Sequence, residues 1–243
     1  MVPHLLEEKT GELSLRSLHR VARCFYEPKA VFSGVAKAPT FFWVLLLSAL
    51  LTLGVQVVLV PRIDLEATIS QQLSRSGQEI SEEQLQEAVK GAQRFQKLAL
   101  FLAPLGTLAV TALLAGLYFL ALKAVGSDAE YPPVLSAVAH AGFPPSVTQS
   151  LLLAVVASTR GQLPAQEIPR LVKSNLAAFL PEGAPKMLFG LGQVLDLFNL
   201  WYWVLLAWGL SAVGGVSGRK AAGILAVLWG LWAILQMGLA LLR

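Results

Sequence analysis

Residues 41–60 read FFWVLLLSALLTLGVQVVLV, a run without a single charged side chain. An α-helix needs about 20 apolar residues to cross the roughly 30 Å hydrocarbon core of a bilayer. The run is continuously apolar and does not alternate with polar residues, which indicates a helix and not a strand of a membrane barrel. Pro39 precedes it and Pro61 ends it. We therefore predict a first transmembrane span over residues 41–60.

Four more apolar stretches follow along the chain. Hydrophobic residues make up 55% of the sequence and charged residues only 14%, a balance typical of a membrane protein. We predict an all-α, polytopic membrane protein: a bundle of about five transmembrane helices with amphipathic surface helices. Residues 1–38 form an amino-terminal arm and residues 39–243 the transmembrane domain. The further predicted spans cover about 98–122, 134–157, 194–213 and 220–242.

Two adjacent prolines, Pro144 and Pro145, stand inside the third predicted span. Proline has no N–H, and its ring clashes with the carbonyl group four residues earlier in a helix. The apolar run after them, 146–157, is too short to cross a bilayer alone, so the segment from Val134 onward either joins it as a broken helix or lies at the membrane interface. Irregular backbone is tolerated in a membrane where protein covers it. We therefore predict a helix that is broken at Pro144 and Pro145 and buried by neighbouring spans.

The polar stretch between the first two spans contains a helix start. Ser81 and Gln84 have the spacing of a capping box, in which each side chain bonds the backbone N–H of the other residue. Ile80 and Leu85 are placed as a hydrophobic staple around it. We predict that a helix begins here and runs into the second span, so that its first turns extend into water.

Two amphipathic patterns lie outside the spans. Over residues 13–25 the apolar side chains recur at helical spacing, and Arg16, Arg20 and Arg23 take the opposite face. This basic helix either lies on the membrane surface or is a solvated helix that packs on the protein's own loops. A second amphipathic pattern in the loop 158–191 is expected in the head-group region.

The distribution of basic residues favours a cytoplasmic amino terminus, because cytoplasmic loops are enriched in Lys and Arg. Basic side chains gather in the amino-terminal arm and at Arg219 and Lys220, although the first loop, which would then be external, holds several more. The formal net charge is +4, and the basic residues form no stripe interleaved with aromatic ones. This pattern argues against nucleic acid as a partner and favours the lipid bilayer.

Four polar residues in or near the spans are the candidate functional residues. Asp196 and Asn199 lie three positions apart and therefore share a helix face. His140 and Gln149, from the third span, complete the predicted intramembrane polar cluster. Such groups are costly in a bilayer. The cluster is therefore expected either to bind an ion, a proton or a partner helix, or to cap a helix near the membrane surface.

Catalytic signatures are missing from the sequence. It contains no HExxH pair that could hold zinc, no GxSxG elbow that exposes a serine and no GxxxxGK[ST] loop that cradles a nucleotide. The three histidines and the single cysteine, Cys24, are too scattered for a metal site. We therefore expect no catalytic residue, no metal and no cofactor.

Four stretches stand in a set order and spacing around the spans, namely residues 26–39, 131–144, 196–201 and 217–221. Together they resemble the Yip-domain family of Ypt/Rab-interacting membrane proteins, in its prokaryotic branch. The resemblance implies a five-helix membrane domain with a cytoplasmic amino terminus, in a prokaryotic inner (plasma) membrane. Eukaryotic members interact with Rab-type small GTPases. This sequence lacks their long amino-terminal region and DLYGP-type motif, so small GTPase binding is not carried over.

Two functions follow from these expectations. The first is a non-enzymatic membrane adaptor or organiser that packs against other membrane proteins, or against a second copy in a homo-oligomer, or shapes lipid through its amphipathic arms. The alternative is a small transporter or lipid-moving protein that uses the intramembrane polar cluster.

Overall fold

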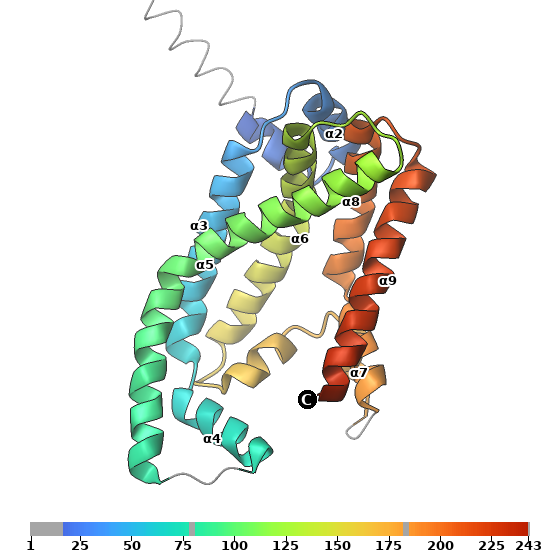
Figure 1. Cartoon of the computed structure of the whole chain (residues 1–243). Helices are drawn as coiled ribbons and strands as arrows, with labels where there is room; N and C mark the ends of the chain where they lie inside the picture. Colours follow the sequence, from blue (N-terminus) through green and yellow to red (C-terminus); the bar gives the residue numbers. More distant parts are fainter. Residues whose placement is uncertain (1–16, 78–80, 182–184, 243) are drawn as a thin grey trace, which may run out of the picture. The chain divides into compact units, whose positions relative to one another are not determined.

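The structure is a computed structural model that describes residues 17–77, 81–181 and 185–242. Its described part is helical, with two isolated β-bridges and no strand. Five helices are long and apolar enough to cross a membrane, which confirms the predicted all-α, polytopic fold. They are α3 (Phe42–Leu59, continued by η1, Val60–Arg62), α5 (Glu82–Ala124), α6 (Tyr131–Ser158), α8 (Leu197–Gly214) and α9 (Gly218–Leu242), all drawn in Figure 1.

Shorter helices join or flank these five. A helical segment at residues 17–23 and a turn lead into α2 (Pro28–Lys37), and α4 (Leu65–Ser76) follows the first span. In the loop 158–191 the expected amphipathic helix is replaced by two 3-10 helices, η2 (Ala165–Arg170) and η3 (Leu176–Phe179). Pro164 and Pro169 interrupt that pattern, because neither can donate a helical hydrogen bond. Helix α7 (Lys186–Val194) then leads to α8.

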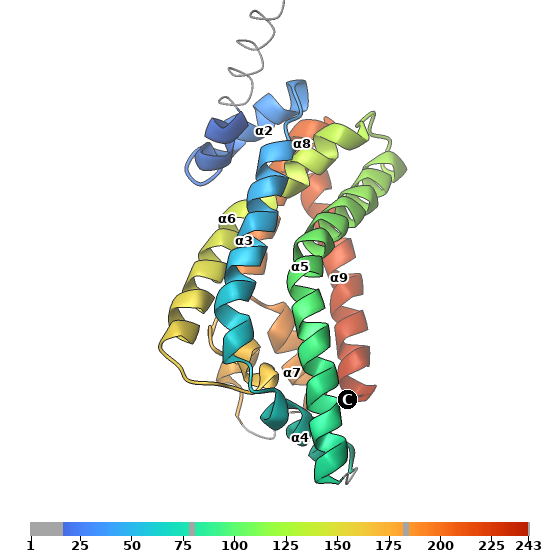
Figure 2. The same cartoon turned by 90° about the vertical axis from the view of Figure 1, so that its left-hand side faces the viewer.

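The chain forms two compact units. The first, which we call the core unit, comprises the described residues of 1–48, 108–146 and 174–243. Its centre is apolar and fully buried, with Phe32, Leu122, Val134, Leu206 and Leu210 at 0% exposure. Helix α2 packs on α8, and α9 packs on both α7 and α8. Figure 2 shows α2 at the end of the core unit at which α3 begins.

The second unit comprises residues 49–107 and 147–173. Two hydrogen bonds join its two chain segments. Asp64 N donates to Leu163 O at 2.9 Å, and Leu163 N donates to Arg62 O at 2.8 Å. The Asp64 carboxylate also caps α4 by accepting from Ala67 N at 2.9 Å. Thr68 adds a third bond between the two segments, since its hydroxyl oxygen accepts from Ala165 N at 2.9 Å.

Helix α5 begins as its sequence predicts. Ser81 N donates to Gln84 Oε1 at 3.0 Å, and Gln84 N donates to Ser81 Oγ at 3.3 Å, so the capping box is confirmed. The helix is 43 residues long, more than a bilayer requires, and its polar first turns extend the second span. Pro104 lies inside α5 without ending it.

Helix α6 is continuous where the sequence predicts a break. It runs for 28 residues through Pro144 and Pro145. Because prolines lack an N–H, the carbonyl groups of His140 and Ala141 lose their usual partners four residues later. The His140 carbonyl accepts a hydrogen bond from Cys24 instead, at 3.2 Å. The hydrogen bond from Cys24 therefore replaces one of the two that the prolines remove, and the helix continues through them.

Candidate functional site

The most elaborate polar arrangement of the core unit holds the amino-terminal arm against α6. Cys24 is 1% exposed, and its Sγ donates to the His140 carbonyl oxygen at 3.2 Å. Ser136, 0% exposed and one turn earlier on α6, accepts from Thr40 N at 3.1 Å and donates to Thr40 O at 2.9 Å. Arg20 donates to Thr40 Oγ1 at 3.2 Å. We call Arg20, Cys24, Thr40, Ser136 and His140 the arm lock.

The arm lock closes the arm into a loop. Arg20 also donates to Ala38 O at 2.7 Å, so one guanidinium joins the beginning and the end of the segment that contains α2. His140 Nδ1 donates to Ser136 O at 2.8 Å, while its Nε2 has no hydrogen-bond partner among the described residues. These polar groups therefore bond mainly to backbone atoms of neighbouring segments, a structural use that leaves them unavailable as an exposed reactive group.

Apolar contacts complete the docking of the arm. Phe32 of α2 inserts where Gly209 of α8 provides space, since a Cβ at that glycine would lie 3.2 Å from both the Phe32 ring and the Ala137 Cβ. The Phe25 ring meets the Phe143 ring edge-on, with centroids 6.4 Å apart. The arm is thus packed on α6 and α8 through both polar and apolar side chains.

Burial governs the chemistry of Cys24. It raises the pKa of the thiol from 9.0 to about 12, because a thiolate would lose its hydration there. Only a thiolate is a strong nucleophile or metal ligand, so the buried thiol acts as a small hydrogen-bond donor.

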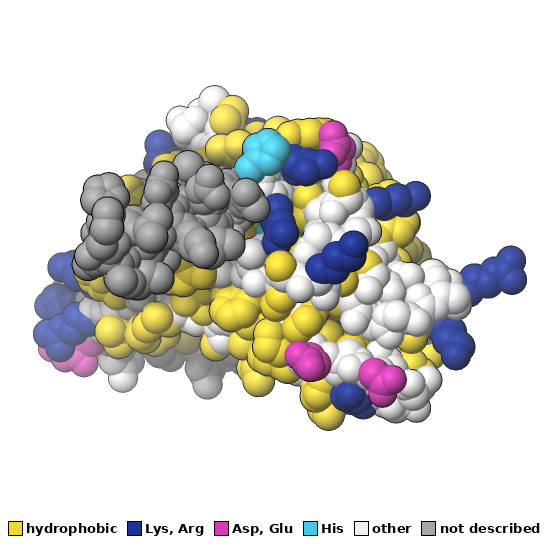
Figure 3. Space-filling view, turned by 90° about the horizontal axis from the view of Figure 1, so that it is seen from above, with side chains coloured by type: hydrophobic (Ala, Val, Ile, Leu, Met, Phe, Trp, Pro, Cys, Tyr) yellow, Lys and Arg dark blue, Asp and Glu magenta, His cyan; other side chains and the backbone are white. Residues whose placement is uncertain are grey.

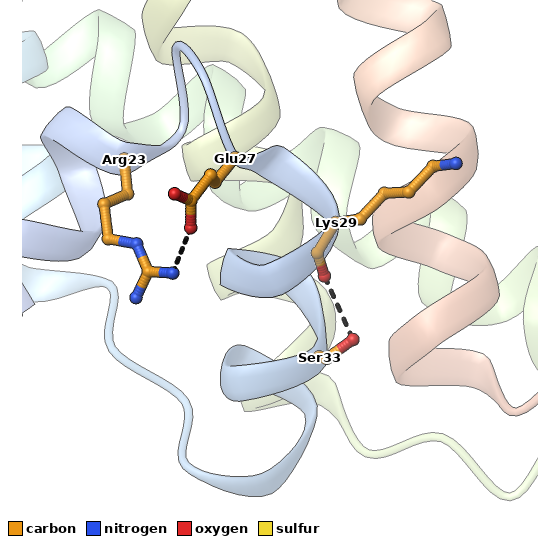
Figure 4. A network of polar contacts seen from close by, with 4 residues as sticks. All are labelled: Arg23, Glu27, Lys29 and Ser33. Carbon is orange, nitrogen blue, oxygen red and sulfur yellow. Dashed lines mark hydrogen bonds and ion pairs between the residues drawn. The ribbon is translucent and has the colours of Figure 1, made fainter.

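The predicted basic face of residues 13–25 is largely engaged within the protein. Arg16 lies outside the described residues, and Arg20 belongs to the arm lock. Arg23 forms an ion pair with Glu27, drawn in Figure 4, and this contact raises the pKa of the guanidinium. Lys29 extends its ammonium to 4.9 Å from the centre of a Trp208 ring.

The four residues of the predicted intramembrane polar cluster have different surroundings. Asp196 is 6% exposed and caps α8, because its Oδ1 accepts from Phe198 N at 2.8 Å and from Asn199 N at 3.2 Å. Its other oxygen accepts from the Ser174 hydroxyl. The Asn199 side chain is exposed, His140 belongs to the arm lock, and Gln149 is an exposed residue of the second unit.

Asp196 therefore has the second of the two roles that its position allows, that of a helix cap at the start of a span. Thr40, Ser136 and Ser174 were missed by the sequence analysis. Each bonds a residue that was identified there: Thr40 bonds Arg20, Ser136 bonds His140 and Ser174 bonds Asp196. A signal exists for Ser136, which stands four residues before His140 and so shares its helix face. Among the described residues, no three His, Cys, Asp or Glu side chains gather closely enough to hold a metal ion.

The comparisons with known proteins agree with this architecture. A family model, the Yip1 domain, matches residues 22–240, which include the arm lock from Cys24 onward and all five candidate spans up to Gly238. No curated protein and no solved structure matches the sequence. Because the family model covers nearly the whole sequence, the chain belongs to the Yip1 domain family.

Proposed function

We propose that the protein is a non-enzymatic membrane adaptor or organiser, which holds its amino-terminal arm in a fixed position and presents it to other membrane proteins. The arm lock carries this proposal. Its buried side chains Cys24 and Ser136 bond backbone atoms of another segment, and the His140 ring bonds the Ser136 carbonyl of its own helix. The buried polar side chains of the core unit thus hold the amino-terminal arm in position.

The spans offer a second kind of surface for partners. Several large apolar side chains of α5 point outward, among them Phe101 at 72% exposure and Leu113 at 74%. In a bilayer such side chains contact lipid tails or the helices of another membrane protein. An organiser needs this combination of a positioned arm and accessible helix faces.

The surroundings of the polar residues give no support for transport. A polar path needs side chains that face one another along the spans. Asp196 bonds Ser174 and the first turn of α8, whereas His140 bonds Ser136. We therefore do not extend the proposal to a transporter or a lipid-moving protein.

The proposal includes a location. Exposed basic residues of the core unit lie on α2 and at the start of α9, namely Lys29, Lys37, Arg219 and Lys220. Figure 1 shows these two segments at one end of the core unit. Under the rule that basic residues stay in the cytoplasm, this end faces the cytoplasm, with the protein in a prokaryotic inner (plasma) membrane.

Site-specific photo-crosslinking in native membranes tests the proposal. A photoreactive phenylalanine analogue replaces Ser33, an exposed residue of α2, and the same exchange is made in a Ser136→Val background that breaks the arm lock. We expect a defined set of captured membrane proteins with the intact lock and loss of that set without it. Equal capture in both backgrounds, or solute flux through proteoliposomes of the purified protein, would contradict the proposal.

A further inference from the structure

One surface of the core unit has a charge pattern that the arm lock does not explain. Lys29, Ser33 and Lys37 stand four residues apart on α2 and are all exposed, whereas Val31, Phe32 and Val35 on the other side of the helix are buried. The three exposed residues therefore form one stripe along the helix. Figure 4 shows Lys29 and Ser33 one turn apart, with the Ser33 hydroxyl donating to Lys29 O at 3.0 Å.

Further basic residues flank the stripe at the same end of the core unit. Lys123 ends α5, and Arg219 and Lys220 begin α9; all three are exposed. The end of α5 lies close to the end of α8, four residues before α9 begins, because a Cβ on Gly214 would lie 2.7 Å from the Leu122 side chain. Figure 3 looks onto this end and shows Lys and Arg side chains spread between hydrophobic ones.

The acidic residues at this end do not cancel the basic ones. Glu27 is already paired with Arg23. Asp128 and Glu130 are exposed in the turn between α5 and α6. The basic residues of the segments 20–37, 123 and 219–220 are more numerous than these three acidic ones, namely Arg20, Arg23, Lys29, Lys37, Lys123, Arg219 and Lys220.

The position of the stripe identifies its partner. Lys37 stands five residues before Phe42, where the span α3 begins, and the Lys29 ammonium lies 4.9 Å from the ring centre of Trp208. Nearby aromatic side chains are exposed, with Tyr26 at 63% and Phe42 at 65%. Exposed aromatic rings beside the cations at the end of a span are typical of the lipid head-group layer. A cation beside the start of a span can meet lipid phosphates there.

We propose that the stripe Lys29–Ser33–Lys37, together with Lys123, Arg219 and Lys220, binds the head groups of anionic phospholipids. This inference goes beyond the adaptor role, since it names a lipid class and not a protein partner. The cations attract the negative charge of the lipid phosphates. The surface is exposed, so the attraction weakens as salt concentration rises.

The test measures lipid binding to the full chain in detergent by native mass spectrometry. The apparent Kd of the first bound lipid is determined for phosphatidylglycerol, which is anionic, and for phosphatidylcholine, which is zwitterionic. We expect several-fold tighter binding of phosphatidylglycerol to the wild type. A basic side chain near an anionic surface contributes about 1 kcal/mol, or about fivefold in affinity. The variant Lys29→Gln, Lys37→Gln, Arg219→Gln, Lys220→Gln should lose at least about tenfold for phosphatidylglycerol alone.

A matched variant controls for the loss of charge. Lys90→Gln, Arg94→Gln, Lys97→Gln, Arg160→Gln removes the same number of exposed cations from the second unit and should retain the preference within about twofold. Should the first variant fail to fold, a salt titration of the wild type decides, because added salt must weaken phosphatidylglycerol binding and leave phosphatidylcholine binding unchanged. Equal affinity of the wild type for the two lipids, equal loss in both variants, or salt-independent binding would overturn the proposal and favour an acidic protein segment.

Discussion

At the scale of single residues, Ser136 shows how one hydroxyl can join two distant segments. It accepts from Thr40 N and donates to Thr40 O, 96 positions away in the sequence. We predict that Ser136→Ala lowers the free energy of unfolding by about 1–3 kcal/mol, the usual cost of a backbone group that is left buried and unpaired. Unfolding by denaturing detergent measures the effect. Ser33→Ala, on the exposed face of α2, is the control and should change stability little.

Cys24 provides a test of burial through its chemistry. Because the folded protein raises the pKa of the thiol above its value of 9.0 in water, the thiol contributes stability below about pH 9, which is lost as the pH rises towards 12. At pH 8 we expect a permeant maleimide to label Cys24 much more slowly in the folded protein than after denaturation. Comparable labelling rates in the two states would contradict the burial of Cys24.

Some of these contacts between residues can be predicted from the sequence, and others cannot. The capping box of Ser81 and Gln84 is predictable because both partners lie within one helical turn. The contact between Ser136 and Thr40 is not, because it depends on how two segments 96 positions apart pack together. The role of Cys24 is not predictable either, because its acceptor lies 116 positions away and is a carbonyl group that Pro144 leaves free.

At the scale of elements, the beginning of α8 distinguishes a structural from a transport role for Asp196. Asn and Asp are about equally good helix caps, whereas Ala costs about 0.5–2 kcal/mol at such a position. We therefore predict that Asp196→Ala destabilises the protein by that amount and that Asp196→Asn is close to the wild type. Detergent unfolding gives the stability of each variant. A polar path that needs a negative charge would instead lose its activity in both.

The contact between α2 and α8 depends on the absence of a side chain at Gly209. A Cβ there would lie 3.2 Å from the Phe32 ring and from Ala137, whereas one at Gly142 would lie 3.7 Å from Tyr202, an ordinary contact. We predict that Gly209→Val destabilises the protein by about 1–3 kcal/mol through overpacking. Gly142→Ala should be tolerated, because alanine favours helix over glycine by about 1 kcal/mol. Equal melting temperatures for the two variants would count against the packing described.

Helices were predictable to different degrees for physical reasons. The spans follow from apolar runs of sufficient length, a local property, and all five were found. The course of α6 depends on partners outside the helix, such as the Cys24 thiol, so the prolines suggested a break that the structure does not have. The four residues of the polar cluster were grouped only because they are polar and lie in or near predicted spans. Their surroundings differ because helix packing determines which helix faces meet.

At the scale of the whole molecule, the central claim is a five-span membrane domain of the Yip1 family whose arm is docked at one membrane surface. Labelling of single cysteines in sealed vesicles with a membrane-impermeant maleimide, in a Cys24→Ala background, tests it most directly. Cysteines at Lys37 and Arg219 should react from one side of the membrane, and cysteines at Arg94 and Arg160 from the other. Labelling of all four positions from the same side would contradict the account.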